Sequence, residues 1–583
     1  MGQRRRLGYR RAFLTALMAV IVGLACTTTI SKDLVHEHAR PRDVFVTSAV
    51  TINAAATTTA ISDSDVYGLT QADVDKTMDM LRASNITAVR LLIPWAGVEA
   101  TQGTLDWSTV DKTVNSAASR NIAVVGMVNS TPRWAVASGG QYLSGRPASP
   151  DVYADFVAKF VTRYVGKIAA VEIWNEPNAV TFYTPLPDPA GYVDLLKAAY
   201  PKVKAIDPSI VVVSAGLGCV LSLGSISINP VAYLTQMYAA GAKPYFDALS
   251  FHPYLYTLKF SGGVGKANSP VEQLMQMRQV MTANGDDGKK IWATEYGQPA
   301  SSGGAANENA FIADMLVKWQ ELPYTGPMFI YTTRDRKTGS SSAQDTFGIF
   351  QTDWTPKAAQ QTVQAGATGA IPKSAEFQQF ATVTDPALGT PLTPVYKTTD
   401  GSWAQVRTVD TVFETTSGFI ASPDPVAVKA GSYLLEPVGP FANGYQDFNK
   451  STGLRVWYSD ATGAHSGAGH IAKVWVPELG LATSDESGGP TGTSMNFEHG
   501  KISWSPFGGA KITWASGHGP GTPTTTTTTT PTTLTTVPTT PTTPPPTTTV
   551  PPTTTPPKGG LGAPVVAVLT FFSNLFGSLG GGR

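Results

Sequence analysis

The run AAVEIWNE at residues 169–176 is an apolar segment that ends abruptly in two polar residues. Runs of this kind recur between residues 43 and 365. Amphipathic segments lie between them, such as TQADVDKTMDMLRAS (70–84) and SPVEQLMQMRQVMTAN (269–284). Strands that alternate with helices predict parallel strand–helix–strand units. The predicted strands are VFVTSAVTI (44–52), AVRLLIPW (88–95), IAVVGMV (122–128), AAVEIWNE (169–176), IVVVSAG (210–216), FDALSFHPY (246–254), KIWATEYG (290–297) and PMFIYTT (327–333).

Eight such units predict an α/β fold, a (β/α)8 TIM barrel over residues 43–370. A doubly wound sheet is the alternative, but no Gly-rich phosphate loop follows the first predicted strand. A TIM barrel carries its active site at the C-terminal ends of its strands. Those ends hold two glutamates, Glu176 and Glu295, together with aromatic and amide side chains. Carboxyl pairs perform acid–base and nucleophilic chemistry on sugars, and aromatic faces stack on pyranose rings, so the strand ends indicate sugar chemistry.

The strand-end motifs resemble those of clan A glycoside hydrolases. VEIWNEPN (171–178) is closest to family 39, with family 5 next, and the resemblance covers about residues 60–362. It implies a glycosidase acting on O-glycosyl compounds, with Glu176 as acid/base, Glu295 as nucleophile and Asn175 at the sugar 2-OH. Many clan members have a Trp where this chain has Tyr331, which leaves the sugar preference open. The supporting motifs are VRLLIPWAGVEATQGTLDWSTVD (89–111), TPRWA (131–135), LSFHPY (249–254), WATEYG (292–297) and FGIFQTDWTPKAA (347–359).

Several other residues near the predicted strand ends are candidate substrate contacts. They are Arg90, Trp95, Trp134, Asn175, His252, Tyr254 and Tyr331. Arg90 could hold Glu295 ionised or could instead pair with Glu172, and Tyr254 or Tyr296 could donate to Glu295. His252 could be structural.

The tryptophans could belong to the core, and we favour Trp134 as the one that lines the cleft because its loop is polar. Glu99 is expected to brace a loop, and Asp335 is a weak rival to Glu295. No cluster has metal-ligand spacing, so no metal or cofactor is implied.

The N-terminal residues 1–42 predict an export signal and leader. Five arginines within residues 2–11 precede an apolar run from Ala12 to Ala25, which is shorter than a membrane-spanning helix. Arg10-Arg11 fits twin-arginine export, and a general secretory signal is the alternative. A lipoprotein-like cleavage at Cys26 and an uncleaved anchor stay open. The protein is therefore expected to be secreted or associated with the cell envelope, with membrane contact only through the leader or the tail.

Composition argues against nucleic-acid binding. Lys+Arg is 43 and Asp+Glu is 42, a net charge of +1, whereas a nucleic-acid binder needs a basic excess or face. The two cysteines, Cys26 and Cys219, are too few for a disulfide framework. Cys219 lies in an apolar run and is expected to be buried rather than catalytic.

The C-terminal part divides into three segments: repeats over residues 371–516, a Thr/Pro-rich linker over 517–558 and a Gly-rich apolar tail over 559–583. Weak self-similarity at about 46 residues, marked by Leu388-Gly389, Leu435-Glu436-Pro437 and Leu479-Gly480, predicts a repeated β-rich unit. These markers resemble LGFP repeats of exported proteins in mycolate-walled bacteria such as mycobacteria and other actinobacteria. The resemblance implies binding to cell-envelope glycan, with Trp457 and Trp504 expected at the surface. A β-domain that only supports the barrel is the alternative.

Two classes of function follow from these observations. The first is a secreted retaining glycosidase that cleaves an envelope or extracellular polysaccharide. The second is a non-catalytic carbohydrate-binding wall protein on a barrel scaffold. The presence of both glutamates favours the first.

Overall fold

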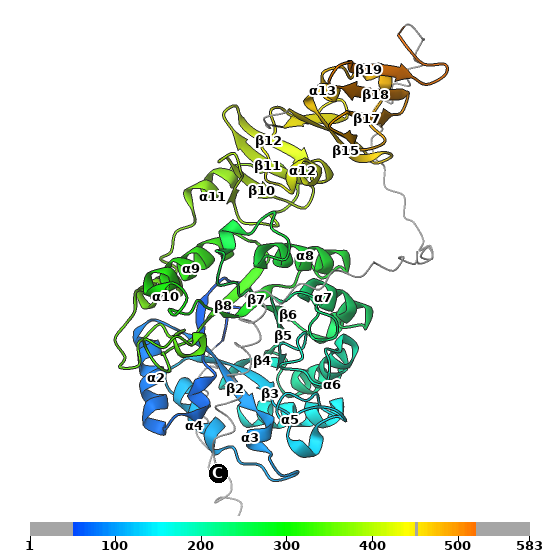
Figure 1. Cartoon of the computed structure of the whole chain (residues 1–583). Coiled ribbons are helices and arrows are strands. Elements are labelled where there is room, and N and C mark those ends of the chain that lie inside the picture. The colour runs from blue at the N-terminus through cyan, green and yellow to red at the C-terminus, as the bar shows by residue number, and fades with distance from the viewer. Residues whose placement is uncertain (1–50, 449–452, 521–583) are drawn as a thin grey trace, which may run out of the picture. The chain divides into compact units, whose positions relative to one another are not determined.

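The computed structural model describes residues 51–448 and 453–520. Within them, eight parallel strands close into a barrel in the order β1 to β8, and helices surround it (Figure 1). The TIM barrel predicted from the sequence is confirmed. Its strands are β1 (Thr59–Ser62), β2 (Ala88–Pro94), β3 (Ala123–Asn129), β4 (Ile168–Asn175), β5 (Val211–Gly218), β6 (Ala248–His252), β7 (Ile291–Tyr296) and β8 (Thr325–Tyr331).

The first strand is not where the sequence predicts it. The segment 44–52 lies mostly outside the described residues, and the barrel is closed by β1, the four-residue run TAIS. All four residues of β1 are buried, and the strand pairs with both β2 and β8. Its register sets Ser62 beside Arg90. The C-terminal end of β1 therefore contributes to the same rim as β2.

The helices begin at strong sequence signals. Four of them start with a polar N-cap whose side chain accepts a backbone N–H, followed at once by proline: Ser149-Pro150, Asp188-Pro189, Asn229-Pro230 and Ser269-Pro270. The main helices of the barrel are α2 (Gln71–Ala83), α4 (Ser108–Ala118), α5 (Pro150–Arg163), α6 (Pro189–Ile206), α7 (Pro230–Ala239), α8 (Pro270–Ala283), α9 (Gly304–Trp319) and α10 (Ala358–Ala367). The short helix α3 (Trp95–Val98) follows β2, and α11 (Ala375–Phe380) follows the barrel.

The interior of the barrel is closed by a small apolar cluster with a member from every strand. The cluster consists of Ala60, Ala88, Ala123, Val125, Ala170, Val213, Ala248, Trp292 and Phe329. The rings of Trp292 and Phe329 stack at a centroid distance of 6.3 Å among alanines and valines from the other strands. Large rings among small side chains fill the barrel efficiently.

The C-terminal region is β-rich, as predicted. It contains three consecutive antiparallel sheets with strand orders β12-β11-β10-β9, β13-β14-β15 and β16-β17-β18-β19. The glycines that open β12, β15 and β19, namely Gly418, Gly463 and Gly509, all have positive φ, which glycine adopts at little cost. The elements are β9 (Tyr396–Lys397), β10 (Trp403–Val406), β11 (Asp410–Thr415), β12 (Gly418–Pro423), α12 (Asp424–Gly431), β13 (Tyr445–Phe448), β14 (Leu454–Ser459), β15 (Gly463–Ala468), α13 (Gly469–Ala472), β16 (Ser487–Gly489), β17 (Gly492–Phe497), β18 (Gly500–Ser505) and β19 (Gly509–Trp514).

Trp457 corrects a prediction about these sheets. It is fully buried, whereas the sequence analysis expects it at the surface. Val456 packs in one apolar cluster and Trp457 in another, so this stretch of β14 is buried on both faces. Trp504 is partly buried and stacks on His470 at 4.4 Å.

The predicted leader, the linker from residue 521 onward and the tail fall outside the described residues. Among the helices of the part that is described, none is both long and apolar enough to span a membrane.

Candidate active site

The two glutamates lie at the C-terminal rim of the barrel, where the sequence places them. Glu176 follows the last residue of β4, and Glu295 lies in β7. Glu176 has a positive φ of 42°, a conformation that L side chains rarely adopt, and Trp174 two residues earlier has a φ of 74°. Local strain of this kind is concentrated at functional sites, where the surrounding structure maintains it.

Arg90 pairs with both of the acidic residues that the sequence offers as alternative partners, Glu295 and Glu172. Its Nη1 donates to Glu295 Oε1 at 2.5 Å and its Nε donates to Glu172. Nη2 donates to Asn175 Oδ1 at 2.8 Å. The guanidinium is 1% exposed, so these charge-assisted bonds are made away from water. Arg90 therefore pairs with both carboxylates, and its predicted contact with substrate stays a prediction.

Glu295 is held on both oxygens. Oε1 accepts from Arg90, and Oε2 accepts from the Tyr254 hydroxyl at 3.2 Å. Tyr254 thus contacts the nucleophile candidate, as one of the two tyrosine alternatives predicts. The Tyr296 hydroxyl lies 3.4 Å from the Phe311 carbonyl oxygen instead. The side chain of Glu295 is 15% exposed and lines a cavity.

Glu176 has a different environment. It is 4% exposed, and its Oε1 lies 2.8 Å from Nδ1 of His252. Burial raises the pKa of Glu176 and the charge of Glu295 adds to it, whereas a His252 ring that donates to it or is charged would lower it. Oε2 is buried without a hydrogen-bond partner among the described residues. A buried carboxyl whose pKa is raised, beside a second carboxyl that accepts from a guanidinium, is the pattern of an acid–base pair.

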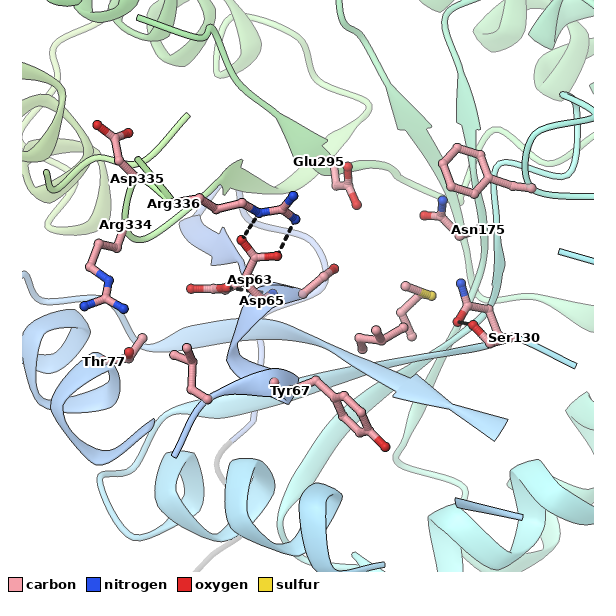
Figure 2. A pocket seen from close by; sticks show the side chains of 17 residues that line it. Asp63, Asp65, Tyr67, Thr77, Ser130, Asn175, Glu295, Arg334, Asp335 and Arg336 are labelled. Atoms are coloured by element: carbon pink, nitrogen blue, oxygen red, sulfur yellow. Dashed lines mark hydrogen bonds and ion pairs between the residues drawn. The ribbon is translucent and has the colours of Figure 1, made fainter. Parts of the chain in front are cut away.

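A cavity of about 390 Å³ opens above this rim (Figure 2). Asn175 and Glu295 lie at one side of it, and residues that follow β1 and β8 lie at the other. Its lining residues are Asp63, Ser64, Asp65, Tyr67, Gly68, Leu69, Thr77, Leu92, Met127, Asn129, Ser130, Asn175, Phe182, Glu295, Arg334, Asp335 and Arg336. Volumes of a few hundred Å³ with a small number of polar groups are typical of ligand sites.

Two acids after β1 are site residues that the sequence analysis missed. Asp65 forms a two-pronged ion pair with Arg336, with distances of 2.7 and 2.5 Å. Asp63 Oδ1 accepts from the backbone N–H groups of Asp65 and Val66. Burial, followed by the charge of Asp65, raises the pKa of Asp63 to about 6. The signal that would reveal them is their position directly after a strand, which depends on placing β1 correctly.

Four further predicted contacts do not line this cavity, as Glu176 does not, and their contact with substrate stays a prediction. Trp95 is fully buried and donates to Glu99, because it belongs to an aromatic core beneath the rim. Trp134 packs edge-on against Trp95 and donates to the Glu99 carbonyl, and it is absent from the lining of the cavity. Tyr331 is 3% exposed and packs against Phe347. His252 is fully buried and contacts Glu176 rather than the cavity.

Glu99, Asp335 and Cys219 are weaker candidates for the site. The Glu99 carboxylate accepts from Trp95 and from the Gly103 N–H, so it braces its loop as expected. Asp335 pairs with the buried Lys357 at 2.7 Å, which leaves it unsuited to replace Glu295. Cys219 is partly buried, and burial together with the charge of Glu176 raises the pKa of its thiol to about 12. It therefore stays protonated at neutral pH.

A closed eight-stranded barrel with one glutamate after the fourth strand and another in the seventh has the architecture of a clan A glycoside hydrolase. Residues 50–324 match the model of the family described as Cellulase (glycosyl hydrolase family 5). The match spans most of the barrel, which is therefore similar to a glycoside hydrolase domain. Among curated proteins the sequence has no match.

Several solved structures of glycoside hydrolases are similar to the chain at low sequence identity. A family 39 glycoside hydrolase from the gut symbiont Bacteroides cellulosilyticus WH2 is 17% identical, with 71% of this chain and 80% of that chain covered and a TM-score of 0.45. The GH39 enzyme from Xanthomonas axonopodis pv. citri is 14% identical, with 62% and 72% covered and a TM-score of 0.42. GH5_18 from Streptomyces cattleya, in complex with GlcNAc, is 13% identical, with 54% and 80% covered and a TM-score of 0.41.

Proposed function

We propose that this protein is an exported retaining glycosidase that cleaves O-glycosidic bonds of an envelope or extracellular polysaccharide by double displacement. The observation that carries the proposal is the contrast between the two glutamates. Arg90 and Tyr254 bind both oxygens of Glu295, which favours its carboxylate. Burial raises the pKa of Glu176, which favours its protonated form. One group is therefore suited to attack and the other to donate a proton.

The first step breaks the glycosidic bond. The Glu295 carboxylate attacks the anomeric carbon, and the leaving oxygen departs with the proton of Glu176. This forms a covalent glycosyl–enzyme ester and leaves Glu176 as a carboxylate. In the second step Glu176 takes a proton from water, whose oxygen attacks the same carbon and releases Glu295. Two inversions return the original anomeric configuration.

Asn175 has a role that fits its surroundings. Its Oδ1 is occupied by Arg90, and its side chain lines the cavity beside Glu295. The bond from Arg90 fixes the orientation of the amide, so its Nδ2 is the group available to a sugar hydroxyl. This orientation supports the assignment of Asn175 to the 2-OH that the family resemblance implies.

The test separates the roles of the two glutamates. The purified chain is screened on a panel of polysaccharides and aryl glycosides, and the anomer formed first is read by proton NMR. Glu295→Gln should abolish turnover on every substrate. Glu176→Ala should retain glycosylation by aryl glycosides with good leaving groups and give a glycosyl azide of retained configuration when azide is added. An inverted product would refute the retaining mechanism, and binding of glycan without any cleavage would favour the non-catalytic alternative.

We further propose that the repeats bind envelope glycan and that the N-terminal leader directs export. The support for the first is the succession of three similar antiparallel sheets over the segment with LGFP-like markers. The support for the second is the arginine-rich, then apolar, N-terminal sequence. Arg10→Lys combined with Arg11→Lys should block export if the twin-arginine route is used, as measured by fractionation. Recovery of most of the wild-type protein in the cytosol would overturn the proposal of export.

A further inference from the structure

A third glutamate, Glu172, lies beneath the two catalytic candidates and has no place in the reaction itself. It is fully buried in β4. Arg90 Nε donates to its Oε2, while the Gly216 N–H at 3.0 Å and the Thr294 hydroxyl at 2.8 Å donate to its Oε1. A carboxyl group that receives three donors, one of them a guanidinium, acts as an acceptor at both oxygens.

The direction of the hydrogen bonds at Thr294 follows from Glu172. A threonine hydroxyl has a single hydrogen, and Glu172 receives it. The other contacts of Thr294 Oγ1 must therefore be donors. Ser250 Oγ lies 2.6 Å away, and Nε2 of His252 lies 2.9 Å away. Nε2 of His252 consequently carries a hydrogen.

The same ring faces Glu176 through its other nitrogen. Nδ1 lies 2.8 Å from Glu176 Oε1. In a neutral imidazole with a hydrogen on Nε2, Nδ1 has only a lone pair to offer. An ionised Glu176 would set a second lone pair against it, whereas a protonated Glu176 donates to it. The orientation of the ring therefore favours the acid form of Glu176.

We propose that Glu172 and Thr294 are positioning residues that hold His252 in its Nε2–H tautomer and thereby keep a proton on the Glu176 carboxyl. The catalytic importance of this tautomer rests on the proposed function, in which Glu176 is the acid/base. The His252 ring has no room to shift sideways, because it packs against the backbone of Gly216. A Cβ at that position would lie 2.0 Å from Nε2 of His252.

The other groups around the Glu176–His252 pair either act in opposite directions or are neutral. The charged ones are Arg90 from β2 and Glu295 from β7, of which Arg90 lowers and Glu295 raises the pKa of Glu176. Three more titratable groups interact electrostatically with Glu176: Cys219, Tyr254 and Tyr256. All three have a raised pKa and are neutral at neutral pH. The His252 nitrogen lies within hydrogen-bond distance of the Glu176 carboxyl.

The tautomer can be measured without any substrate. The full chain is labelled with ¹⁵N-histidine, and the ring resonances of His252 are assigned by their loss in His252→Gln. The wild type should show a hydrogen on Nε2 and none on Nδ1 at neutral pH. Thr294→Val removes the acceptor and should populate the Nδ1–H tautomer, while Thr294→Ser should restore the wild-type spectrum. Ser250→Ala, which removes the other donor to the same oxygen, should leave the tautomer unchanged.

The kinetic measurement uses an aryl glycoside that the wild type cleaves. Loss of one hydrogen bond is worth about one pK unit, so Thr294→Val should move the alkaline limb of the kcat/KM profile about one unit to lower pH. Activity should then fall about tenfold on the alkaline side and little on the acidic side, with Thr294→Ser close to wild type. A uniform loss across pH, an Nδ1–H tautomer in the wild type or a doubly protonated ring would overturn the proposal. If the expected tautomer is found but no glycoside is cleaved, the proposed function fails and the positioning of His252 stands.

Discussion

Removing the charge of Arg90 should destabilise the barrel, and removing its buried partner as well should restore much of the loss. Arg90→Met keeps the length of the side chain but leaves Glu172 and Glu295 without a cation. Glu172 is fully buried, so its charge has no access to water. Breaking a buried ion pair on one side costs about 3–5 kcal/mol, because the remaining charge is uncompensated.

The double variant isolates that cause. In Arg90→Met with Glu172→Gln, no buried charge is left opposite the missing guanidinium except that of the partly exposed Glu295. At roughly 2–4 °C per kcal/mol for a large domain, the single variant should lower the Tm of the barrel by about 6–20 °C. The double variant should regain more than half of this, but not the activity, since Glu295 still lacks its cation.

Thermal unfolding followed by circular dichroism at two pH values measures these effects. The loss in Arg90→Met should be smaller at acidic pH, where the stranded carboxyls can take up protons. The matched control is Arg163→Met, which removes an ion pair with Asp111 whose two side chains are 42% and 31% exposed. Exposed pairs contribute about 0–1 kcal/mol, so the control should hardly change the Tm. A double variant no more stable than the single would refute the reasoning.

Three further outcomes are expected. Burial raises the pKa of Glu308 to about 8 from a usual value of 4.5, so its carboxyl loses the proton at lower pH in the unfolded chain than in the folded one. The free energy of unfolding should therefore fall as pH rises from about 4.5 to about 8. Glu308→Gln should flatten this fall in a pH series of unfolding curves. Asp63→Asn should raise KM by about tenfold at pH 7 and remove any change of KM near pH 6, since Asp63 lines the cavity and has a pKa of about 6; an unchanged KM would exclude it from sugar binding. Trp457→Ala should destabilise the second sheet by about 3–5 kcal/mol, whereas Trp504→Ala should weaken pull-down by isolated envelope with little loss of stability.

The sequence predicts the barrel well because its parallel strands are buried on both faces and appear as continuous apolar runs. Seven predicted strands overlap β2 to β8. The first fails because TAIS at β1 is short and mixes small and polar residues, while VFVTSAVTI is longer and more apolar. What makes TAIS a strand is its pairing on both sides, with β2 and β8, and such long-range contacts leave no local signal.

That error propagates to the site. Asp63 and Asp65 follow β1 directly, so a misplaced first strand hides both of them. The two glutamates can be predicted from the sequence because each ends a clear strand within a recognisable motif. The buried contacts of Arg90 and His252 depend on register across several strands, and residue type alone indicates only that they are polar groups near the rim.

The tryptophans show why exposure is hard to predict from the sequence. Residue type and a polar neighbourhood suggest sugar stacking, but burial depends on what packs above the ring. Trp95 lies among Trp134, Tyr153 and Phe156, which together leave it no surface. Trp457 lies in a sheet whose two faces are both covered, and alternation along a strand carries no information in that case.

The four N-cap and proline pairs that open α5, α6, α7 and α8 divide the barrel into parts that can change independently. Each pair fixes where a loop from the catalytic rim ends and where a helix of the scaffold begins, because proline sets the first helical φ before any hydrogen bond forms. Loops of different length or sequence could therefore be inserted ahead of these pairs without moving the helix behind them. The segments that follow β3, β4, β5 and β6 can therefore change with substrate while the scaffold behind them stays the same.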